Sequence, residues 1–193
     1  MNDKAHHLHL SIAEAGKLLA LKGDHKGALQ HYREALRLAV SSSAPEVFFR
    51  HYTQCVLESL ELTEAYDEII EFCRNADEHY ASLGLSSSLH RRDHGSVLER
   101  LGLVQLKKGD IEAGCESLEQ ARKIAGEGVL PISEEIGSWL KRGYRVDASR
   151  ILESQRKHHY FVVRRDQVNP DLARSLGQVK GTAFPDPAGT LTG

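Results

Sequence analysis

The chain has 193 residues and a formal net charge of −2; 40% of its residues are hydrophobic, 27% charged and 6% aromatic. This length suits one domain with a hydrophobic core, with or without a tail, and no apolar run of about 18 residues exists to form a membrane-spanning helix. The N-terminus lacks the basic start and apolar block of a secretory signal. The three cysteines are widely spaced, which indicates buried thiols and no disulfide framework, so we expect a cytoplasmic protein.

Charge is distributed unevenly along the sequence. Residues 1–140 carry a net charge of −7 and residues 141–193 a net charge of +5, and residues 46–80 alone carry −7. Opposite charge at the two ends of one chain predicts electrostatic docking within the molecule, between copies or onto a partner. The alternative is that these charges cover solvated helix faces, since a surface ion pair contributes only about 0–1 kcal/mol.

Apolar residues recur at intervals of three and four along most of the chain, which predicts amphipathic helices. Short turns interrupt the pattern near Gly23, Glu64, Gly109 and Gly143, so we expect antiparallel helix pairs that bury their apolar faces together. The predicted pairs cover about residues 9–40, 46–82, 89–125 and 133–157.

Two segments, KGDHKGALQHYREAL and KGDIEAGCESLEQAR, resemble the turn and second helix of tetratricopeptide repeats. Each has a Gly-Asp turn, small residues at set distances after it, and a glycine in the preceding helix. These small residues allow neighbouring helices to approach closely, and they are Gly16, Ala28, Ala35, Gly102, Gly114 and Ala121. The second unit, with Glu64 at its turn, matches less closely, and the fourth matches as little as expected of a capping unit. The spacing of the turns resembles the long-helix variants of the family.

The resemblance covers about residues 9–155 and implies an all-α fold, a right-handed superhelix of antiparallel helix pairs over residues 1–157. In this family the first helix of each pair lines a concave groove in which a segment of a partner protein lies. The positions of this sequence that match the groove are Lys17, Gln54, Glu58, Glu61, Glu99 and Leu103. The middle of such a groove is acidic, which favours a partner segment with basic residues. Alternatively, Glu58 and Glu61 solvate an exposed helix. Only Lys17 matches the residues with which chaperone-binding members hold a C-terminal carboxylate, so that function is not expected.

Residues 158–193 form the predicted tail, which is basic and extended. Its apolar run lies between His158-His159 and Arg164-Arg165, is too short for a helical stripe, and predicts an extended docking segment. The residues assigned to docking are Tyr160, Phe161, Val162, Arg164 and Arg165. Asn169-Pro170 predicts a short helix over residues 170–176, and the Pro- and Gly-containing remainder is typical of a linker.

The sequence contains no Gly-rich phosphate loop, no Gly-x-Ser-x-Gly elbow and no Cys-x-x-Cys pair. His90 and His94 have a spacing that can chelate a metal, but the two arginines between them would repel a cation. We therefore expect no catalytic residue, no cofactor and no metal site. The basic stretch 141–165 contains tyrosines that could stack on bases, yet acidic residues interrupt it, so nucleic acid is not favoured as a partner.

These patterns predict a non-enzymatic adaptor or scaffold that binds a segment of a partner protein in the concave groove of its repeats. One alternative is a structural assembly subunit, a homo-oligomer whose basic C-terminal tail docks on the acidic second repeat of a neighbour. Another alternative is a regulatory domain that senses a peptide or contacts nucleic acid.

Overall fold

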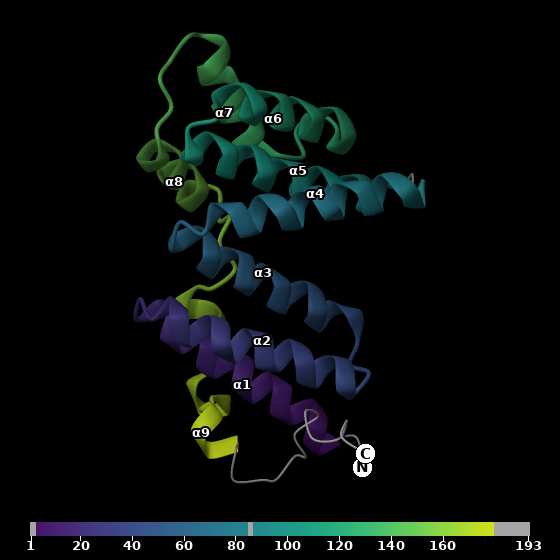
Figure 1. Ribbon diagram of the computed structural model, residues 1–193, viewed down its shortest axis with the longest axis vertical. Coiled ribbons are helices and arrows are strands. Elements are labelled where there is room, and N and C mark those ends of the chain that lie inside the picture. Colours follow the sequence, from purple (N-terminus) through teal and green to yellow (C-terminus); the bar gives the residue numbers. More distant parts are fainter. Residues whose placement is uncertain (1–2, 85–86, 180–193) are drawn as a thin grey trace, which may run out of the picture. The chain divides into compact units, whose positions relative to one another are not determined.

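The computed structural model describes residues 3–84 and 87–179, with side chains for residues 8–84 and 87–177. Most of these residues are helical and none of them lies in a strand, so the expected all-α class is confirmed (Figure 1).

The chain divides into two compact units. The first unit comprises the residues up to Ser59 together with those from Val163 onward, and the second comprises Leu60–Val162. One boundary falls within α3 (Glu46–Leu62) and the other in the irregular segment that follows α8 (Ala148–Lys157). The sequence predicts a division after residue 157, whereas the structure groups residues from Val163 onward with the first helices.

The first unit begins with α1 (Asp3–Leu21) and α2 (His25–Ser41), which pack against each other. The Asp24 carboxylate caps α2, because its Oδ1 accepts a hydrogen bond from the Gly27 backbone N–H at 2.9 Å. Buried side chains from α1, α2 and α3 form the core of this unit, namely Ile12, Ala13, Ala35, Leu38, Ala39 and Tyr52. Three short elements follow Val163 in the same unit: η1 (Arg165–Gln167), η2 (Pro170–Leu172) and α9 (Leu176–Val179).

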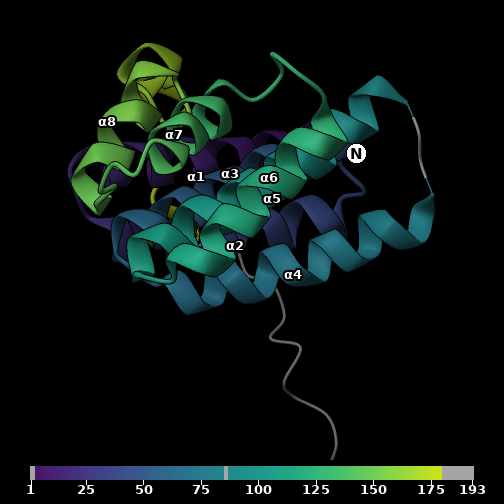
Figure 2. The same cartoon turned by 90° about the horizontal axis from the view of Figure 1, so that it is seen from above.

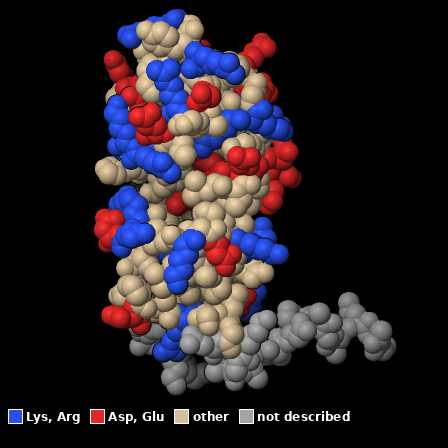
Figure 3. Space-filling model, turned by 90° about the vertical axis from the view of Figure 1, so that its left-hand side faces the viewer, with Lys and Arg blue, Asp and Glu red and all other residues tan. Residues whose placement is uncertain are grey.

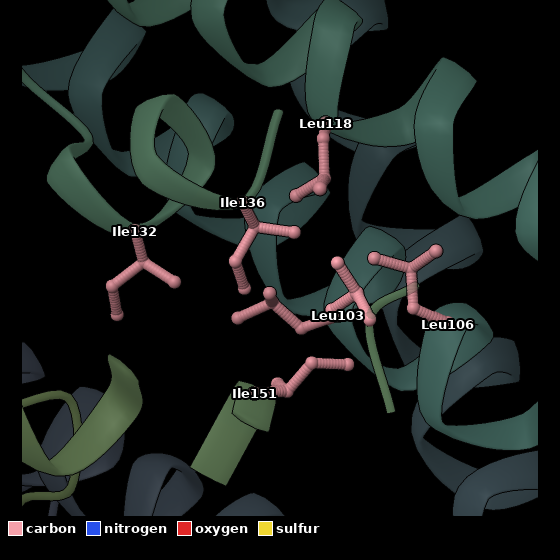
Figure 4. Packing of buried hydrophobic residues seen from close by; sticks show 7 residues of the cluster. Leu103, Leu106, Leu118, Ile132, Ile136 and Ile151 are labelled. Carbon is pink, nitrogen blue, oxygen red and sulfur yellow. The ribbon is translucent and has the colours of Figure 1, made fainter. Parts of the chain in front are cut away.

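The second unit contains α4 (Tyr66–Leu83), α5 (Ser88–Lys108), α6 (Ile111–Ala125), α7 (Pro131–Lys141) and α8. Helices α5 and α6 lie side by side along their lengths (Figures 1 and 2). Aliphatic side chains from α5 to α8 converge in one cluster (Figure 4), and its buried members are Leu103, Leu106, Leu118, Ile132, Ile136, Val146 and Ile151. Burial of each such side chain contributes about 1.5–3 kcal/mol to stability.

Most helix ends agree with the predicted pairs to within a few residues, although α1 begins at Asp3 and not near residue 9. The predicted helix over residues 170–176 is shorter than expected, because η2 ends at Leu172 and α9 begins only at Leu176. The predicted linker from residue 180 onward lies outside the described residues.

The four predicted turn positions share one backbone conformation. Gly23, Glu64, Gly109 and Gly143 have φ angles of 84°, 60°, 95° and 76°. Glycine adopts this left-handed conformation readily, whereas a side chain makes it strained. Glu64 therefore occupies a turn position at which glycine would be unstrained.

Two of the glycines assigned to close helix packing lie where a side chain would not fit. A Cβ atom built on Gly16 would lie 2.7 Å from Cε1 of Tyr32 on α2. A Cβ atom on Gly102 of α5 would lie 2.9 Å from the backbone oxygen of Gly114 on α6. Both helix pairs therefore approach at a distance that only glycine allows.

Candidate interaction surface

On α1, the groove candidate Lys17 is buried, with 7% of its surface exposed. Its Nζ donates a hydrogen bond to Glu14 Oε1 at 2.7 Å, and the second oxygen of Glu14 accepts the backbone N–H of Asn169 at 2.8 Å. Lys17 thus neutralises a carboxylate that holds the C-terminal segment of the first unit, and it does not present its charge to solvent.

On α3, Gln54 is half-buried and Glu58 is buried, with 5% exposed. The Glu58 carboxylate accepts the backbone N–H of Val163 at 3.1 Å, and the Val163 side chain is itself buried. Glu58 therefore acts as a main-chain acceptor for the same segment that Glu14 holds.

The C-terminal segment makes two further main-chain contacts within the first unit. The backbone N–H of Arg174 donates to the carbonyl oxygen of Ser11 on α1 at 3.0 Å, and that of Leu176 donates to Nε2 of His31 on α2 at 3.3 Å. The Leu176 side chain packs against the apolar core of this unit. Residues 163–176, called here the C-terminal strap, thus contact α1, α2 and α3 through four backbone donors.

In the second unit, Glu61 is 2% exposed and lies at the centre of a polar cluster. Its carboxylate accepts hydrogen bonds from Lys107 Nζ at 2.7 Å, Gln155 Nε2 at 2.6 Å and the Tyr160 hydroxyl at 3.1 Å. Arg100 lies 3.6 Å away. Burial disfavours the charged form, but Arg100, Lys107 and the Gln155 hydrogen bond outweigh it, so the pKa of Glu61 lies below its ordinary value.

Glu99 and Leu103 were predicted to line an open groove, but both are buried. Glu99 accepts the backbone N–H of Ser133 at 2.9 Å and its hydroxyl at 2.7 Å, near the start of α7. Burial raises the pKa of the Glu99 carboxyl, and the two Ser133 hydrogen bonds oppose that rise. Leu103 is completely buried in the aliphatic cluster (Figure 4), because every residue of α5 from Leu98 to Leu106 is enclosed.

The residues that were assigned to tail docking differ from one another in burial and in their contacts. Tyr160 is half-buried, with Arg100 4.8 Å above its ring, and Phe161 packs edge-on against that ring at 5.2 Å. Val162 is half-buried, while Arg164 pairs with Asp166 at 3.5 Å and Arg165 is exposed. The tail therefore docks within its own chain, where the Tyr160 hydroxyl bonds Glu61 and the Val163 N–H bonds Glu58.

These placements correct the expectation that Glu58 and Glu61 offer exposed charge. Both carboxylates are buried and accept hydrogen bonds from residues that follow α8. Nor does the face shown in Figure 3 carry a single sign of charge, since its basic and acidic side chains are interspersed. The uneven charge along the sequence thus does not appear as a uniformly charged surface on that face.

Sequence reasoning missed four residues that complete these contacts: Glu14, Lys107, Gln155 and Asn169. Glu14 lies three positions before Lys17, a spacing at which helix side chains pair, so its ion pair had a local signal. The other three bond partners 46 to 155 positions away in the sequence. No local pattern reports contacts of that separation.

The buried thiols are not arranged for nucleophilic chemistry. Burial raises the pKa of Cys55 and of Cys73 to about 12, so both are protonated at neutral pH. His51 Nε2 lies 3.8 Å from Cys55 Sγ, but burial and then Lys17 lower the pKa of His51. This pair therefore lacks the thiolate that a cysteine nucleophile needs.

Among residues with described side chains, no group of three His, Cys, Asp or Glu residues is placed to hold a metal ion. His90 and His94 bond different partners: His90 bonds the Ser87 hydroxyl, and His94 bonds Asp77 and stacks on Tyr80. Within the described ranges, no helix is both long and apolar enough to span a membrane.

Comparison of the sequence with protein-family models found no match. A search of curated proteins found no match, and no solved structure matches the fold. The tetratricopeptide resemblance therefore rests on the sequence motifs and stays a prediction.

Proposed function

We propose that the protein is a non-enzymatic adaptor or scaffold of the tetratricopeptide type, which holds a segment of a partner protein against the first helices of its helix pairs. One observation carries the proposal. Glu14 on α1, Glu58 on α3 and Glu99 on α5 each accept a backbone N–H from a residue outside their own helix.

Such carboxylates are suited to protein partners because every extended segment offers backbone N–H donors. A hydrogen bond to a charged acceptor contributes about 1.5–3 kcal/mol, more than a neutral one. The rigid helices fix the acceptors in space, so a bound segment does not have to order them.

The contacts of the tail give less support to the two alternatives. Val163 and Asn169 bond helices of their own chain, whereas an assembly subunit would place them on a neighbour. Tyr160 packs beneath Arg100 and bonds Glu61, which leaves its ring poorly placed to stack on a nucleic acid base.

The function can be tested by selection from a peptide-display library on the immobilised full chain, with peptides of about the length of the strap. Selected peptides are then measured against wild type, Glu14→Ala and Glu58→Ala, which each remove one main-chain acceptor on a first helix. Glu46→Ala is the matched control, since Glu46 is an exposed carboxylate paired with Arg50.

We expect at least one acceptor variant to weaken binding about tenfold, the value of one such hydrogen bond, and Glu46→Ala to leave it unchanged. Circular dichroism confirms that each variant is folded. The proposal fails if no peptide is enriched over an unrelated helical protein, or if all variants bind the selected peptides equally.

A further inference from the structure

Backbone hydrogen bonds hold the C-terminal strap in the first unit at four places. Val163, Asn169, Arg174 and Leu176 each donate a backbone N–H to Glu58, Glu14, Ser11 and His31, respectively. The Val163 side chain is buried, and the Leu176 side chain packs against the apolar core of the unit, so these two residues supply apolar anchors.

Between the anchors, the strap is mostly exposed. Arg165, Asp171 and Arg174 are solvent-exposed, and Leu172 is 45% exposed in spite of its apolar side chain. A segment with few buried side chains and irregular backbone belongs to the low-stability part of a structure and opens locally.

The surface beneath the strap consists of regular helices, unlike the strap itself. Its acceptors are on α1, α2 and α3, and Glu14 is fixed further by its ion pair with Lys17. A surface that bonds main-chain donors recognises the backbone of a bound segment, while its apolar sites select the side chains at the two ends.

We propose that this surface of the first unit binds a segment of a partner protein, and that the C-terminal strap occupies it as a built-in competitor. The inference rests on the proposed function and specifies its ligand. The partner segment has an apolar residue in the place of Val163 and a leucine-sized residue in the place of Leu176. It has no proline at the places of Val163, Asn169, Arg174 and Leu176, because proline lacks the N–H that these positions donate.

A free segment can bind only those chains in which the tethered competitor has left the surface open. Its apparent affinity is therefore the intrinsic affinity multiplied by the fraction of open chains. A substitution that releases the strap should therefore raise the affinity without changing the surface. Leu176→Ser removes the apolar anchor. Arg174→Pro removes the donor to Ser11, and Ala173, at φ −67° and ψ 128°, already has a conformation that a following proline accepts.

The probe is a fluorescent synthetic peptide of residues 163–177, titrated by fluorescence anisotropy into the full chain carrying each substitution. Leu172→Ser is the matched control, since it makes the same change at an exposed leucine of the same strap. We expect the peptide to bind Leu176→Ser and Arg174→Pro at least about tenfold more tightly than wild type and Leu172→Ser like wild type. A peptide with serine at position 176 should bind none of them.

Hydrogen exchange distinguishes release of the strap from unfolding. Release of the strap raises hydrogen exchange in residues 163–177 while the amides of α1 and α2 stay protected. If Leu176→Ser also raises exchange in α1 and α2, that variant is unfolded there, and the affinity measured with Arg174→Pro is used in its place.

Equal affinity of the peptide for the wild-type chain and a released variant would overturn the competitor role. If peptides from the display library bind but are not displaced by peptide 163–177, this inference fails while the adaptor function stands. If the library yields no ligand for either the wild-type chain or the released Leu176→Ser chain, the adaptor function itself fails.

Discussion

Glu61 is a buried carboxylate whose charge is balanced by the cations of Arg100 and Lys107. We expect Glu61→Gln to lower the free energy of unfolding by about 3 kcal/mol, since it leaves Lys107 and Arg100 without their counter-charge. Urea denaturation followed by circular dichroism measures this change.

Glu46→Gln provides the comparison for that experiment. Glu46 forms an exposed pair with Arg50, and its loss should change stability by less than about 0.5 kcal/mol. Similar small effects for both variants would mean that the cluster around Glu61 is not coupled to folding.

Glu64 is strained where its equivalents in the other turns are glycine. Its φ of 60° lies in the left-handed region, so Glu64→Gly should stabilise the chain by about 0.5–1 kcal/mol. Glu71→Gly, at an exposed position inside α4, should instead destabilise it by about 1 kcal/mol. Thermal denaturation of the two variants should therefore give shifts of opposite sign.

Glu135 gives a pH dependence with a defined direction. Burial opposes its ionisation, but hydrogen bonds from Lys157, Ser154 and His158 outweigh this effect and lower its pKa to about 2. The stability it contributes is complete above the ordinary carboxyl pKa and is lost as the pH falls toward the folded-state pKa.

The loss of stability between about pH 5.5 and 3.5 should accordingly be smaller in Glu135→Gln than in wild type. Urea denaturation at several pH values measures the difference between the two chains. Two parallel curves would show that Glu135 does not titrate with folding.

At the level of single residues, the sequence predicted where the chain turns but not which polar groups are buried. Glycine marks three of the four turns and the repeat spacing places the fourth at Glu64, and both of these signals are local. The burial of Glu58, Glu61 and Glu99 depends on partners supplied by distant segments. A glutamate on a helix has the same sequence pattern whether it faces water or a buried donor.

At the scale of helices, the approach of α5 to α6 is set by two facing glycines. We expect Gly102→Ala to destabilise the chain by roughly 1–2 kcal/mol, because the clash with Leu118 and the Gly114 carbonyl outweighs the helix propensity gained from alanine. Chemical denaturation measures the effect.

Gly177→Ala is the control for this substitution. Gly177 is also helical, but no described atom lies within 4 Å of an added Cβ. It should therefore cause no loss of stability, and an equal loss in both variants would contradict the proposed close contact.

Helix existence and most helix ends were predictable because apolar periodicity and turn residues are local signals. The burial of much of α5 on all sides was not predictable from such local signals. Its polar residues Glu99, Arg100 and Gln105 gave it the pattern of an amphipathic helix with an open face, yet all three are buried. Gln105 accepts a hydrogen bond from Ser117 on α6, and Glu99 bonds Ser133 on α7. In the sequence, buried polar residues that pair across helices therefore cannot be told apart from polar residues on a solvent-exposed helix face.

For the whole molecule, the position of the strap decides between docking within one chain and docking between copies. A segment tethered to its own binding surface has an effective concentration in the millimolar range, so at about 10 µM protein it outcompetes the strap of a second copy. We therefore expect the full chain to be a monomer of 21.5 kDa in solution.

The monomer should persist at low and high salt alike. The strap is held by backbone hydrogen bonds, by the buried Val163 side chain and by the packing of Leu176 on the apolar core, and salt mainly screens interactions between exposed charges. Size-exclusion chromatography with light scattering measures the mass under both conditions. A dimer at low salt that dissociates at high salt would contradict this expectation and would support the assembly subunit, because only contacts between exposed basic and acidic residues of different copies would respond in that way.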